Sequence, residues 1–320
     1  MTDTLHADIS NQKKSEKDTT VEIIIPVLNE ENTIRDLLQS IRSVRLPVKI
    51  STLVIDGGSE DRTIEICKQK NVKVINQKGK GKGNAMREAV EYSQADIVVF
   101  IDGDGTYSIS HLKSMLEPLL KGEADMVIGS RLLGNREEGS ISALNMMGNK
   151  LFNKAINLAL KSHVTDSLTG YRALHRNVFK DLILFSENFE IEVEMTVEAL
   201  AKGYRIVEVP ISYRKRNNSK TKLSPISDGV KIARTLFFVI MNVRPLLFFG
   251  ILSAIIFGIS VYPSSLVIYE KIILGEVVHL PSVVFASLLI VTAVMSLVLG
   301  MLSELVVRTR RRIEYLIGHR

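Results

Sequence analysis

The chain has 320 residues, a net charge of +6 and a single cysteine, Cys67. That length allows one large or two ordinary domains, and one cysteine excludes an internal disulfide. Tryptophan is absent, and the basic residues are not interleaved with aromatic ones, so the sequence does not indicate an RNA-binding surface.

The N-terminal segment 1–20 is polar and mixed in charge, which predicts a disordered tail. It has no apolar core of the kind that signal peptides carry, so nothing indicates export of the N-terminal half.

Short apolar runs rich in β-branched residues alternate with helical patterns between residues 21 and 130. Strands separated by helices predict an α/β fold, with a mostly parallel sheet and helices on both faces. The predicted strands are 21–27, 51–56, 72–76, 96–102 and 124–130. The predicted helices between them are 34–41, 62–69, 84–93 and 110–120.

Polar residues and glycines collect where four of these strands end, at 26–30, 56–59, 102–104 and 129–131. In sheets of this kind, ligands bind beyond the carboxyl ends of the strands. The four segments therefore predict one binding pocket at that edge of the sheet.

Asp102 and Asp104 follow the apolar run 97–101 and are separated by one glycine. Two carboxylates this close repel each other unless a cation lies between them. A calcium-binding EF-hand loop is excluded, because Tyr107 and Lys113 stand where it needs glycine and glutamate. The alternatives are a plain Asp-Gly turn and a site where Mg²⁺ or Mn²⁺ bridges the carboxylates and a diphosphate, and the second is favoured.

The stretch QKGKGKGNA, residues 77–85, alternates glycines with Lys78, Lys80 and Lys82 ahead of a predicted helix. Backbone amides at a helix start, assisted by lysines, suit a phosphate. The spacing matches neither a P-loop nor a dinucleotide-binding fingerprint, so a solvated turn stays open as the alternative.

The C-terminal third is uncharged over residues 245–269 and 280–303. Each run exceeds the roughly 20 residues that cross a bilayer as a helix, so residues 244–307 are predicted to form a two-helix transmembrane hairpin. Arginines flank the outer ends of the hairpin, and the tail 308–320 is basic, which predicts that both termini and the preceding domain are cytoplasmic. A transporter is disfavoured, because neither uncharged run offers an ionisable residue for a pathway.

The segment 224–243, before the hairpin, places apolar side chains opposite Lys231 and Arg234. This pattern predicts an interfacial amphipathic helix that feeds a lipid to the site, with an ordinary core helix as the alternative. Basic residues on both sides of the hairpin attract anionic headgroups, which accounts for the positive net charge without nucleic acid.

Several motifs together resemble those of a known family. In chain order, IIIPVLNEENTI, LVIDGGSEDRT, NQKGKGKGNA, FIDGDG and VIGSR resemble the motifs of inverting family 2 glycosyltransferases, which have the GT-A nucleotide-diphospho-sugar transferase fold. TDSLTGYRALHR and GYRIVEVPISYRKR narrow the resemblance to dolichyl- or polyprenyl-phosphate sugar synthases, over about residues 21–223. A cytosolic domain followed by membrane helices is similar to archaeal members that load the first sugar onto dolichyl phosphate.

The resemblance implies roles for individual residues. The nucleotide-sugar donor would be bound by Pro26, Leu28, Glu30, Val54, Asp56, Gly103 and Arg131, with Lys80 of the glycine-rich stretch beside them. The metal would be held by Asp102 and Asp104. The acceptor phosphate would be bound by Arg216, Lys222 and Arg172. Catalytic roles would fall to Asp104, Arg131, Asp166 and Arg216, and a further pocket position is Glu194.

The implied reaction moves a sugar from a nucleotide-diphospho-sugar to dolichyl or polyprenyl phosphate at the bilayer, with inversion and with Mg²⁺ or Mn²⁺ as cofactor. UDP-hexose or UDP-N-acetylhexosamine is favoured over GDP-mannose, and the product would supply a lipid-linked sugar for protein glycosylation. Thr106 departs from the family, because many relatives have glutamine at this position as a third metal ligand.

Two alternatives to this reaction stay open. One is a transferase that extends a glycolipid or polysaccharide, although a chain without tryptophan lacks the Q-x-x-R-W motif of processive synthases. The other is a non-catalytic membrane scaffold that retains the fold.

Overall fold

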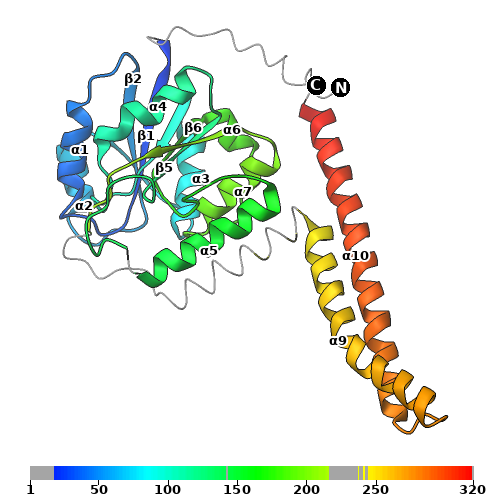
Figure 1. The fold of residues 1–320 in the computed structure, drawn as a ribbon. Coiled ribbons are helices and arrows are strands. Elements are labelled where there is room, and N and C mark those ends of the chain that lie inside the picture. Colours follow the sequence, from blue (N-terminus) through cyan, green and yellow to red (C-terminus); the bar gives the residue numbers. More distant parts are fainter. Residues whose placement is uncertain (1–17, 142, 216–236, 238–240, 242–243, 319–320) are drawn as a thin grey trace. The chain divides into compact units, whose positions relative to one another are not determined.

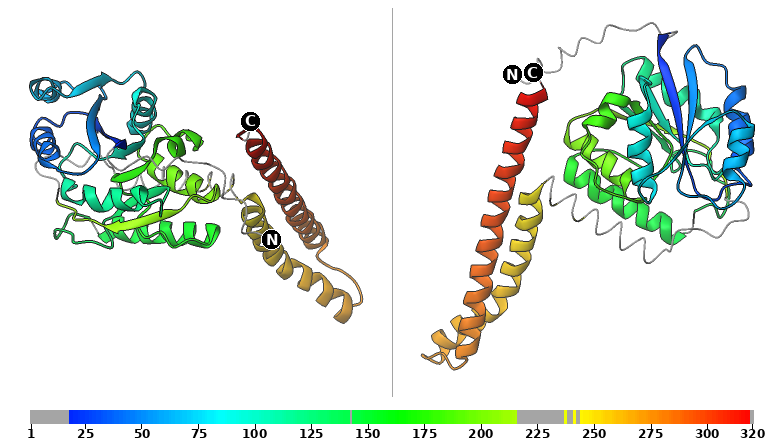
Figure 2. Two further views of the ribbon diagram at one scale, coloured as in Figure 1. Left: turned by 90° about the horizontal axis from the view of Figure 1, so that it is seen from above. Right: turned by 180° about the vertical axis from the view of Figure 1, so that it is seen from behind.

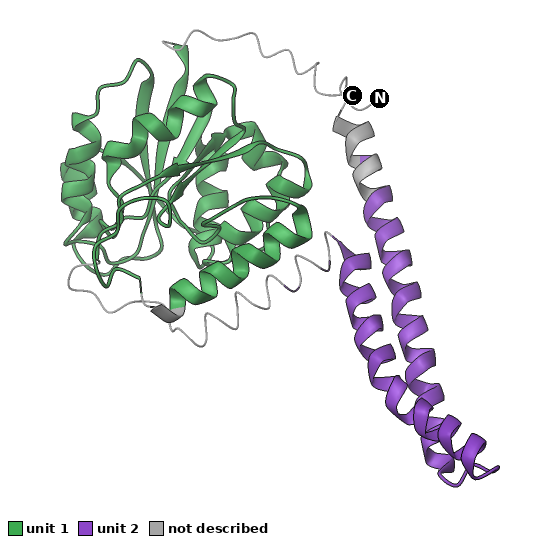
Figure 3. Cartoon of the chain, in the orientation of Figure 1, with its two compact units in different colours: residues 1–235 green, residues 236–320 purple. Residues whose placement is uncertain are grey.

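The computed structural model describes residues 18–141, 143–215, 237, 241 and 244–318. The chain consists of two compact units, residues 1–235 and residues 236–320 (Figure 3). Most of the predicted tail 1–20, almost all of the predicted interfacial segment 224–243, and both Arg216 and Lys222 lie outside the described residues.

The first unit is built on a seven-stranded sheet with the order β3-β2-β1-β4-β6-β5-β7 (Figure 1). Only β6 runs antiparallel to its neighbours, β4 and β5, so the prediction of a mostly parallel sheet is confirmed. The strands are β1 (Thr20–Val27), β2 (Lys49–Asp56), β3 (Lys73–Asn76), β4 (Ile97–Phe100), β5 (Met126–Ser130), β6 (Arg172–His175) and β7 (Ile206–Pro210).

Both faces of the sheet are covered by helices, because its central strands are apolar on both sides. In β1, Ile23 and Ile25 belong to one buried cluster and Ile24 to another, as the two-residue period of a strand requires. The first cluster includes side chains of α1 (Ile34–Ser43), α2 (Thr63–Gln69) and α4 (Leu112–Leu120), and the second those of α3 (Lys82–Tyr92), α6 (Arg176–Asp181) and α7 (Ile191–Ala201). Figure 2 shows helices on both sides of the sheet. A further helix, α5 (Ala143–Leu160), follows β5 in the chain.

Two element boundaries differ from the prediction and affect the site. The strand predicted at 96–102 ends at Phe100, so Asp102 lies in the loop that follows. The helix predicted from residue 84 begins at Lys82, so this lysine belongs to the first turn of α3 and not to the glycine-rich loop.

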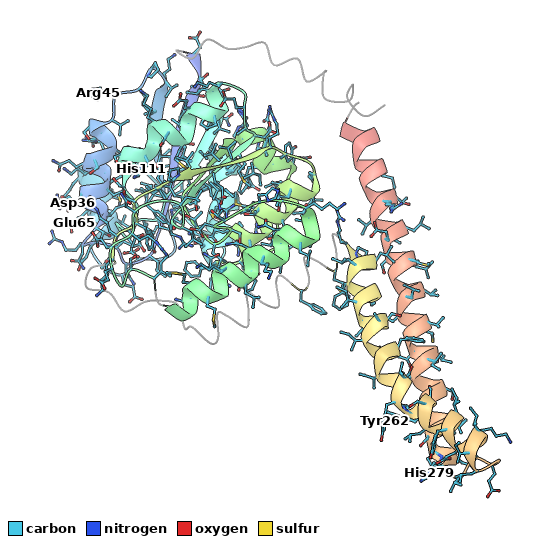
Figure 4. The ribbon with its side chains drawn as sticks, viewed as in Figure 1. Asp36, Arg45, Glu65, His111, Tyr262 and His279 are labelled. Atoms are coloured by element: carbon cyan, nitrogen blue, oxygen red, sulfur yellow. The ribbon has the colours of Figure 1, made fainter. Side chains whose placement is uncertain are left out.

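The second unit is a pair of helices, α9 (Pro245–Ile273) and α10 (Leu280–Gly318). By length and composition, both helices can cross a membrane. Pro245–Ile273 has a mean hydropathy of 2.1, and 11% of its most apolar stretch is buried. Leu280–Thr309 has a mean hydropathy of 2.6, and 22% of its most apolar stretch is buried. The loop between them is closed by Glu270, whose carboxylate accepts hydrogen bonds from the backbone N–H groups of Val278 and His279. His279 is labelled at this end of the helix pair in Figure 4. The fold class predicted from the sequence is therefore observed in both units.

Small residues let α9 and α10 approach each other closely, as is common between helices in membranes. The Ser253 hydroxyl donates to the Ala293 carbonyl at 2.7 Å, and the Ser296 hydroxyl to the Phe249 carbonyl at 3.2 Å. A Cβ atom at Gly300 would lie 2.8 Å from Cβ of Phe249, which is closer than such atoms pack.

Replacing Gly300 by valine should therefore separate the two helices, at a cost of about 1–3 kcal/mol for overpacking. The change is measured as the rate of disulfide formation between cysteines introduced at Ser253 and Ala293 in the membrane-embedded chain, which should fall several-fold. Gly250→Val is the matched control, because a Cβ atom there meets nothing within 4 Å. Equal cross-linking rates in the two variants would contradict this packing.

Candidate active site

The carboxyl ends of β1, β2, β4 and β5 lie at one edge of the sheet, because these strands point in the same direction. Backbone hydrogen bonds continue the pairing past the strand ends, as from Gly57 N to the Val27 carbonyl at 2.9 Å. The sheet thus brings the four polar segments predicted from the sequence, 26–30, 56–59, 102–104 and 129–131, to the same edge.

The central feature of this edge is a chain of three charged side chains from distant segments. The Lys82 ammonium, from the start of α3, forms an ion pair with Oδ1 of Asp102 and a second one with Oε1 of Glu192 on α7, at 2.6 Å. The side chains of Lys82 and Glu192 are 9% and 3% exposed, whereas Asp102 is 26% exposed. Only Asp102 therefore gives this charged group substantial access to solvent.

Electrostatics keep Lys82 protonated in this surrounding. Burial by itself lowers the pKa of Lys82, but Asp102 and Glu192 outweigh it and raise that pKa above its ordinary value. Burial raises the pKa of Glu192, which the neighbouring ammonium opposes. The buried ammonium is thus held as a cation by the two carboxyl groups beside it.

Gly170 makes this arrangement sterically feasible. A Cβ atom there would lie 2.6 Å from Oδ2 of Asp102 and 2.8 Å from the Lys82 ammonium. The Gly170 N–H donates at 2.9 Å to the hydroxyl of Tyr107, which fixes the backbone in this position. Glycine is thus the residue that lets a backbone pass this close to the charged pair.

A second ion pair lies at the end of β5, between Arg131 and Asp166. The Asp166 carboxylate accepts from Nε and a terminal nitrogen of Arg131, both at 2.8 Å, and from the Arg131 backbone N–H at 2.9 Å. Asn149 donates to the same carboxylate at 2.9 Å, and Glu208 accepts from the Asp166 N–H at 2.9 Å. Asp166 is fully buried, whereas the Arg131 side chain is 12% exposed. Asp166 therefore positions Arg131, which is the more exposed of the two paired side chains.

The pKa of Asp166 reflects this pairing. Burial would raise it, but Arg131 and the hydrogen bond from Asn149 bring it below its ordinary value, so the group is ionised. The Tyr213 ring contacts residues of both groups. It lies 5.3 Å from the Arg131 guanidinium and 5.1 Å from the ring of Tyr107, whose hydroxyl binds Gly170 beside Asp102 and Lys82.

Hydrogen bonds within the loop after β4 orient Asp104. Its Oδ1 accepts from the Thr106 hydroxyl at 2.6 Å and from the Thr106 N–H at 3.1 Å. The Thr33 hydroxyl donates to the Gly103 carbonyl at 2.7 Å and fastens the middle of the loop to the residue before α1. Thr106, the departure from the family pattern, thus serves as a hydrogen-bond donor to Asp104.

Of the residues predicted to bind the nucleotide, some lie at the edge of the sheet and one lies in the core. Asp56 accepts from the N–H groups of Gly58 and Ser59, both at 3.1 Å, and so closes the turn after β2. Leu28 is 41% exposed at the end of β1. Val54, by contrast, is fully buried in the core, so its side chain is packed against apolar neighbours and does not reach the edge.

Two positions expected to contact acceptor or pocket lie inside the protein. Arg172 is fully buried and donates to the Thr169 and Ser167 carbonyls and to the Thr196 hydroxyl, at 2.9, 2.7 and 2.8 Å. These bonds hold the loop before β6 against α7, and a role of Arg172 at the acceptor phosphate stays a prediction. Glu194 accepts from the N–H groups at 185 and 186 and likewise supports a loop.

The lysine that faces the carboxylates is Lys82, whereas Lys80, expected to bind the donor, is exposed. Glu192 was also missed by sequence reasoning. Three glutamates, at 192, 194 and 198, stand among the apolar residues of α7, and the sequence does not show which of them are buried. In the structure Glu192 and Glu194 are buried.

The donor atoms at this edge suit a hard divalent cation. No group of three or more His, Cys, Asp or Glu side chains that could hold a metal occurs among the described residues. Asp102 and Asp104 supply carboxylate oxygens, which Mg²⁺ and Mn²⁺ favour, and a bound diphosphate would have to supply further ligands. The ammonium already paired with Asp102 shows that a cation is accommodated at this carboxylate.

Known proteins resemble this chain in sequence and in fold. Residues 22–183 match the model of glycosyl transferase family 2. The chain is similar to glycosyltransferase AglJ of Haloferax volcanii, with 37% identity over 295 residues, 90% of this chain and 94% of the relative. It is also similar to a dolichyl-phosphate hexose transferase of the same organism, with 32% identity over 69% of this chain and 94% of the relative.

The fold is shared with a solved structure of glucosyl-3-phosphoglycerate synthase from Mycobacterium tuberculosis in complex with Mn²⁺, UDP and glucosyl-3-phosphoglycerate. The TM-score is 0.56 at 22% identity, covering 69% of this chain and 80% of that one. This likeness shows the fold, and the mostly parallel sheet predicted from the sequence is thereby placed in the GT-A class.

Replacing Asp166 by asparagine should lower the free energy of unfolding by about 3 kcal/mol, because it leaves the buried guanidinium of Arg131 without its counter-charge. Urea unfolding of the detergent-solubilised chain, followed by circular dichroism, measures the loss. The folded-state pKa of Asp166 is lowered, so its contribution is complete above about pH 4 and declines as the pH falls further. The gap between wild type and variant should shrink accordingly.

The control for this variant is Asp125→Asn, which breaks the more exposed ion pair with Arg205 and should cost about 1 kcal/mol or less. Equal losses in both variants would contradict a special role for the Arg131–Asp166 pair.

Proposed function

Since this chain belongs to glycosyl transferase family 2, we propose that it transfers a hexose or N-acetylhexosamine from a UDP-linked donor to dolichyl or polyprenyl phosphate. The observation that carries the proposal is that the segments bearing Asp102, Asp104 and the cationic Arg131 follow strands that end at one edge of the sheet, in a chain that also has two helices fit to span a membrane. One relative is named for hexose transfer to dolichyl phosphate, and a structural neighbour was solved with UDP and Mn²⁺.

The chemistry asks little of a general base. An acceptor phosphate is anionic at neutral pH, so its oxygen forms the bond to the anomeric carbon while the bond to the diphosphate breaks and the nucleotide leaves. Attack from the face opposite the leaving group inverts the anomeric carbon. Mg²⁺ or Mn²⁺, when bound, would supply Lewis-acid stabilisation of the departing diphosphate.

The residues of this chain provide positioning for that reaction. Asp102 and Asp104 would hold the metal, and Thr106 orients Asp104 for this purpose. Arg131, clamped by Asp166, offers a guanidinium of fixed orientation to an anionic group of the donor. Catalytic assistance from Asp166 would be indirect, through Arg131.

The acceptor side of the proposal rests on the sequence. Arg216 and Lys222 come after β7 and before α9 in the chain, outside the described residues. A cationic pair at this place suits a phosphate carried on a lipid, because charge-assisted hydrogen bonds to phosphate are strong. The arginines flanking the hairpin predict that the transferase unit is cytoplasmic, where a lipid-linked sugar for protein glycosylation would be made.

Transfer is tested with membranes that contain the full chain, dolichyl phosphate, Mn²⁺ and a radiolabelled donor, namely UDP-glucose, UDP-N-acetylglucosamine or GDP-mannose in turn. A UDP-sugar should label an acid-labile lipid that extracts into organic solvent. Asp104→Ala should reduce labelling about a hundredfold or more, since several kcal/mol of charge stabilisation are lost. Asp36→Ala, on α1 (Figure 4), is the control and should label normally.

Donor binding without labelled lipid from any of the three donors would refute the synthase proposal. Labelling of an acceptor that already bears sugar would then favour a transferase that extends a glycolipid. Failure of donor binding as well would favour a scaffold.

Arg216→Ala and Lys222→Ala should each raise the KM for dolichyl phosphate about tenfold or more, because a charge-assisted hydrogen bond contributes roughly 1.5–3 kcal/mol. The affinity for UDP, measured by calorimetry in detergent, should stay within about twofold. Lys215→Ala, adjacent in sequence, is the control. A changed UDP affinity with an unchanged KM would place these two residues at the donor instead.

A further inference from the structure

Lys82 lies where the proposed reaction needs a metal ion. Its ammonium is paired with Asp102, one of the two carboxylates assigned to the metal. An ammonium and a divalent ion at the same carboxylate repel each other, so the ion pair with Lys82 opposes metal binding at Asp102. Metal binding there is therefore favoured when Lys82 shifts to another partner.

Glu192 offers the alternative partner. Its Oε1 already accepts from Lys82 at 2.6 Å. Its Oε2 is buried and has no hydrogen-bond partner within the described part of the chain. A buried carboxylate oxygen without a partner is unusual, and here it belongs to the side chain that already contacts the ammonium.

The backbone of Lys82 is held in place, whereas its long side chain can rotate. Gly83, the next residue, donates to the Glu187 carbonyl at 2.7 Å, and a Cβ atom at Gly83 would collide with the Ser186 carbonyl. The start of α3 is thus docked on the loop before α7. A shift of the ammonium from one carboxylate to the other needs only rotation of side-chain torsions.

We propose that Lys82 is an internal counter-cation of Asp102 that competes with the divalent metal and moves wholly onto Glu192 when the metal binds. This inference rests on the metal site of the proposed function. Lys82 is then a positioning residue: in the metal-free chain it neutralises Asp102, and in the metal-bound chain it satisfies both oxygens of Glu192. Metal alone has to displace an ion pair, so it binds weakly.

Donor binding gains from this arrangement. A nucleotide diphosphate adds negative charge and metal ligands next to Asp102, and so helps the metal to displace Lys82. Metal and nucleotide therefore raise each other's affinity by the same factor. Because Lys82 competes with the metal, the site has a low affinity for the metal ion until the donor binds.

The test measures Mn²⁺ binding to the full chain in detergent, without nucleotide, from the electron paramagnetic resonance signal of free Mn²⁺. Lys82→Met should bind Mn²⁺ about tenfold more tightly than wild type, within the usual range of coupling between sites. Glu192→Gln should bind it several-fold more weakly, because Lys82 then has no second anionic partner. Lys121→Met, which removes a lysine from an exposed ion pair with Glu117, should leave Mn²⁺ affinity unchanged.

A second readout uses UDP. The factor by which UDP raises Mn²⁺ affinity should be smaller in Lys82→Met than in wild type, because less of the displacement cost remains for UDP to offset. Thermal unfolding and circular dichroism establish that each variant is folded.

Unchanged or weaker Mn²⁺ binding in folded Lys82→Met would overturn the inference and leave Lys82 a purely structural ion-pair partner. If that variant does not fold, Glu192→Gln decides alone, and equal or tighter Mn²⁺ binding there overturns it. Mn²⁺ binding that is unaffected by Asp104→Ala would instead refute the metal site of the proposed function. The two failures are therefore distinguishable.

Discussion

Compensation of buried charge is the constraint on which the functional edge of this protein depends. A charged side chain that leaves water needs an opposite charge and hydrogen bonds close by. Lys82 meets this need with carboxylates from the loop after β4 and from α7, and Arg131 meets it with a carboxylate from the loop before β6. Helices and loops that are far apart in the chain are thereby fastened to one edge of the sheet.

The two buried ion pairs differ in how firmly they are held. Asp166 binds Arg131 through two side-chain nitrogens and one backbone N–H, and is itself held by Asn149 and the nearby Glu208. Lys82 divides a single ammonium between two carboxylates, one of which has an unpartnered oxygen. The first arrangement suits a guanidinium of fixed orientation that binds an anionic ligand, and the second suits a cation that can change partners. In the proposed transferase, the first would bind an anionic group of the donor and the second would respond to the metal.

With the proposed lipid-phosphate acceptor, such a site would work without a general base. A lipid phosphate is already a nucleophilic anion, so catalysis depends on placing charges and not on moving a proton. Lys82, Asp102 and Glu192 are ion-paired with one another, as are Arg131 and Asp166, and His111 accepts a hydrogen bond from the Ser212 backbone N–H. The two apolar helices of the second unit fit a protein whose acceptor stays in a bilayer.

Local sequence patterns determined the alternation of strands and helices, the placement of Asp102 and Asp104 after a buried strand, and the two apolar helices, because periodicity and uncharged length act within one segment. The tertiary structure decided which lysine faces the carboxylates. Lys80 and Lys82 share the same motif, and only the docking of α3 on the loop before α7 selects Lys82. The tertiary structure also placed β6 antiparallel between β4 and β5, buried Arg172, and paired Asp166 with Arg131, 35 residues away in the chain. These outcomes depend on contacts between segments distant in the chain, where no local pattern records which charge will be buried beside which.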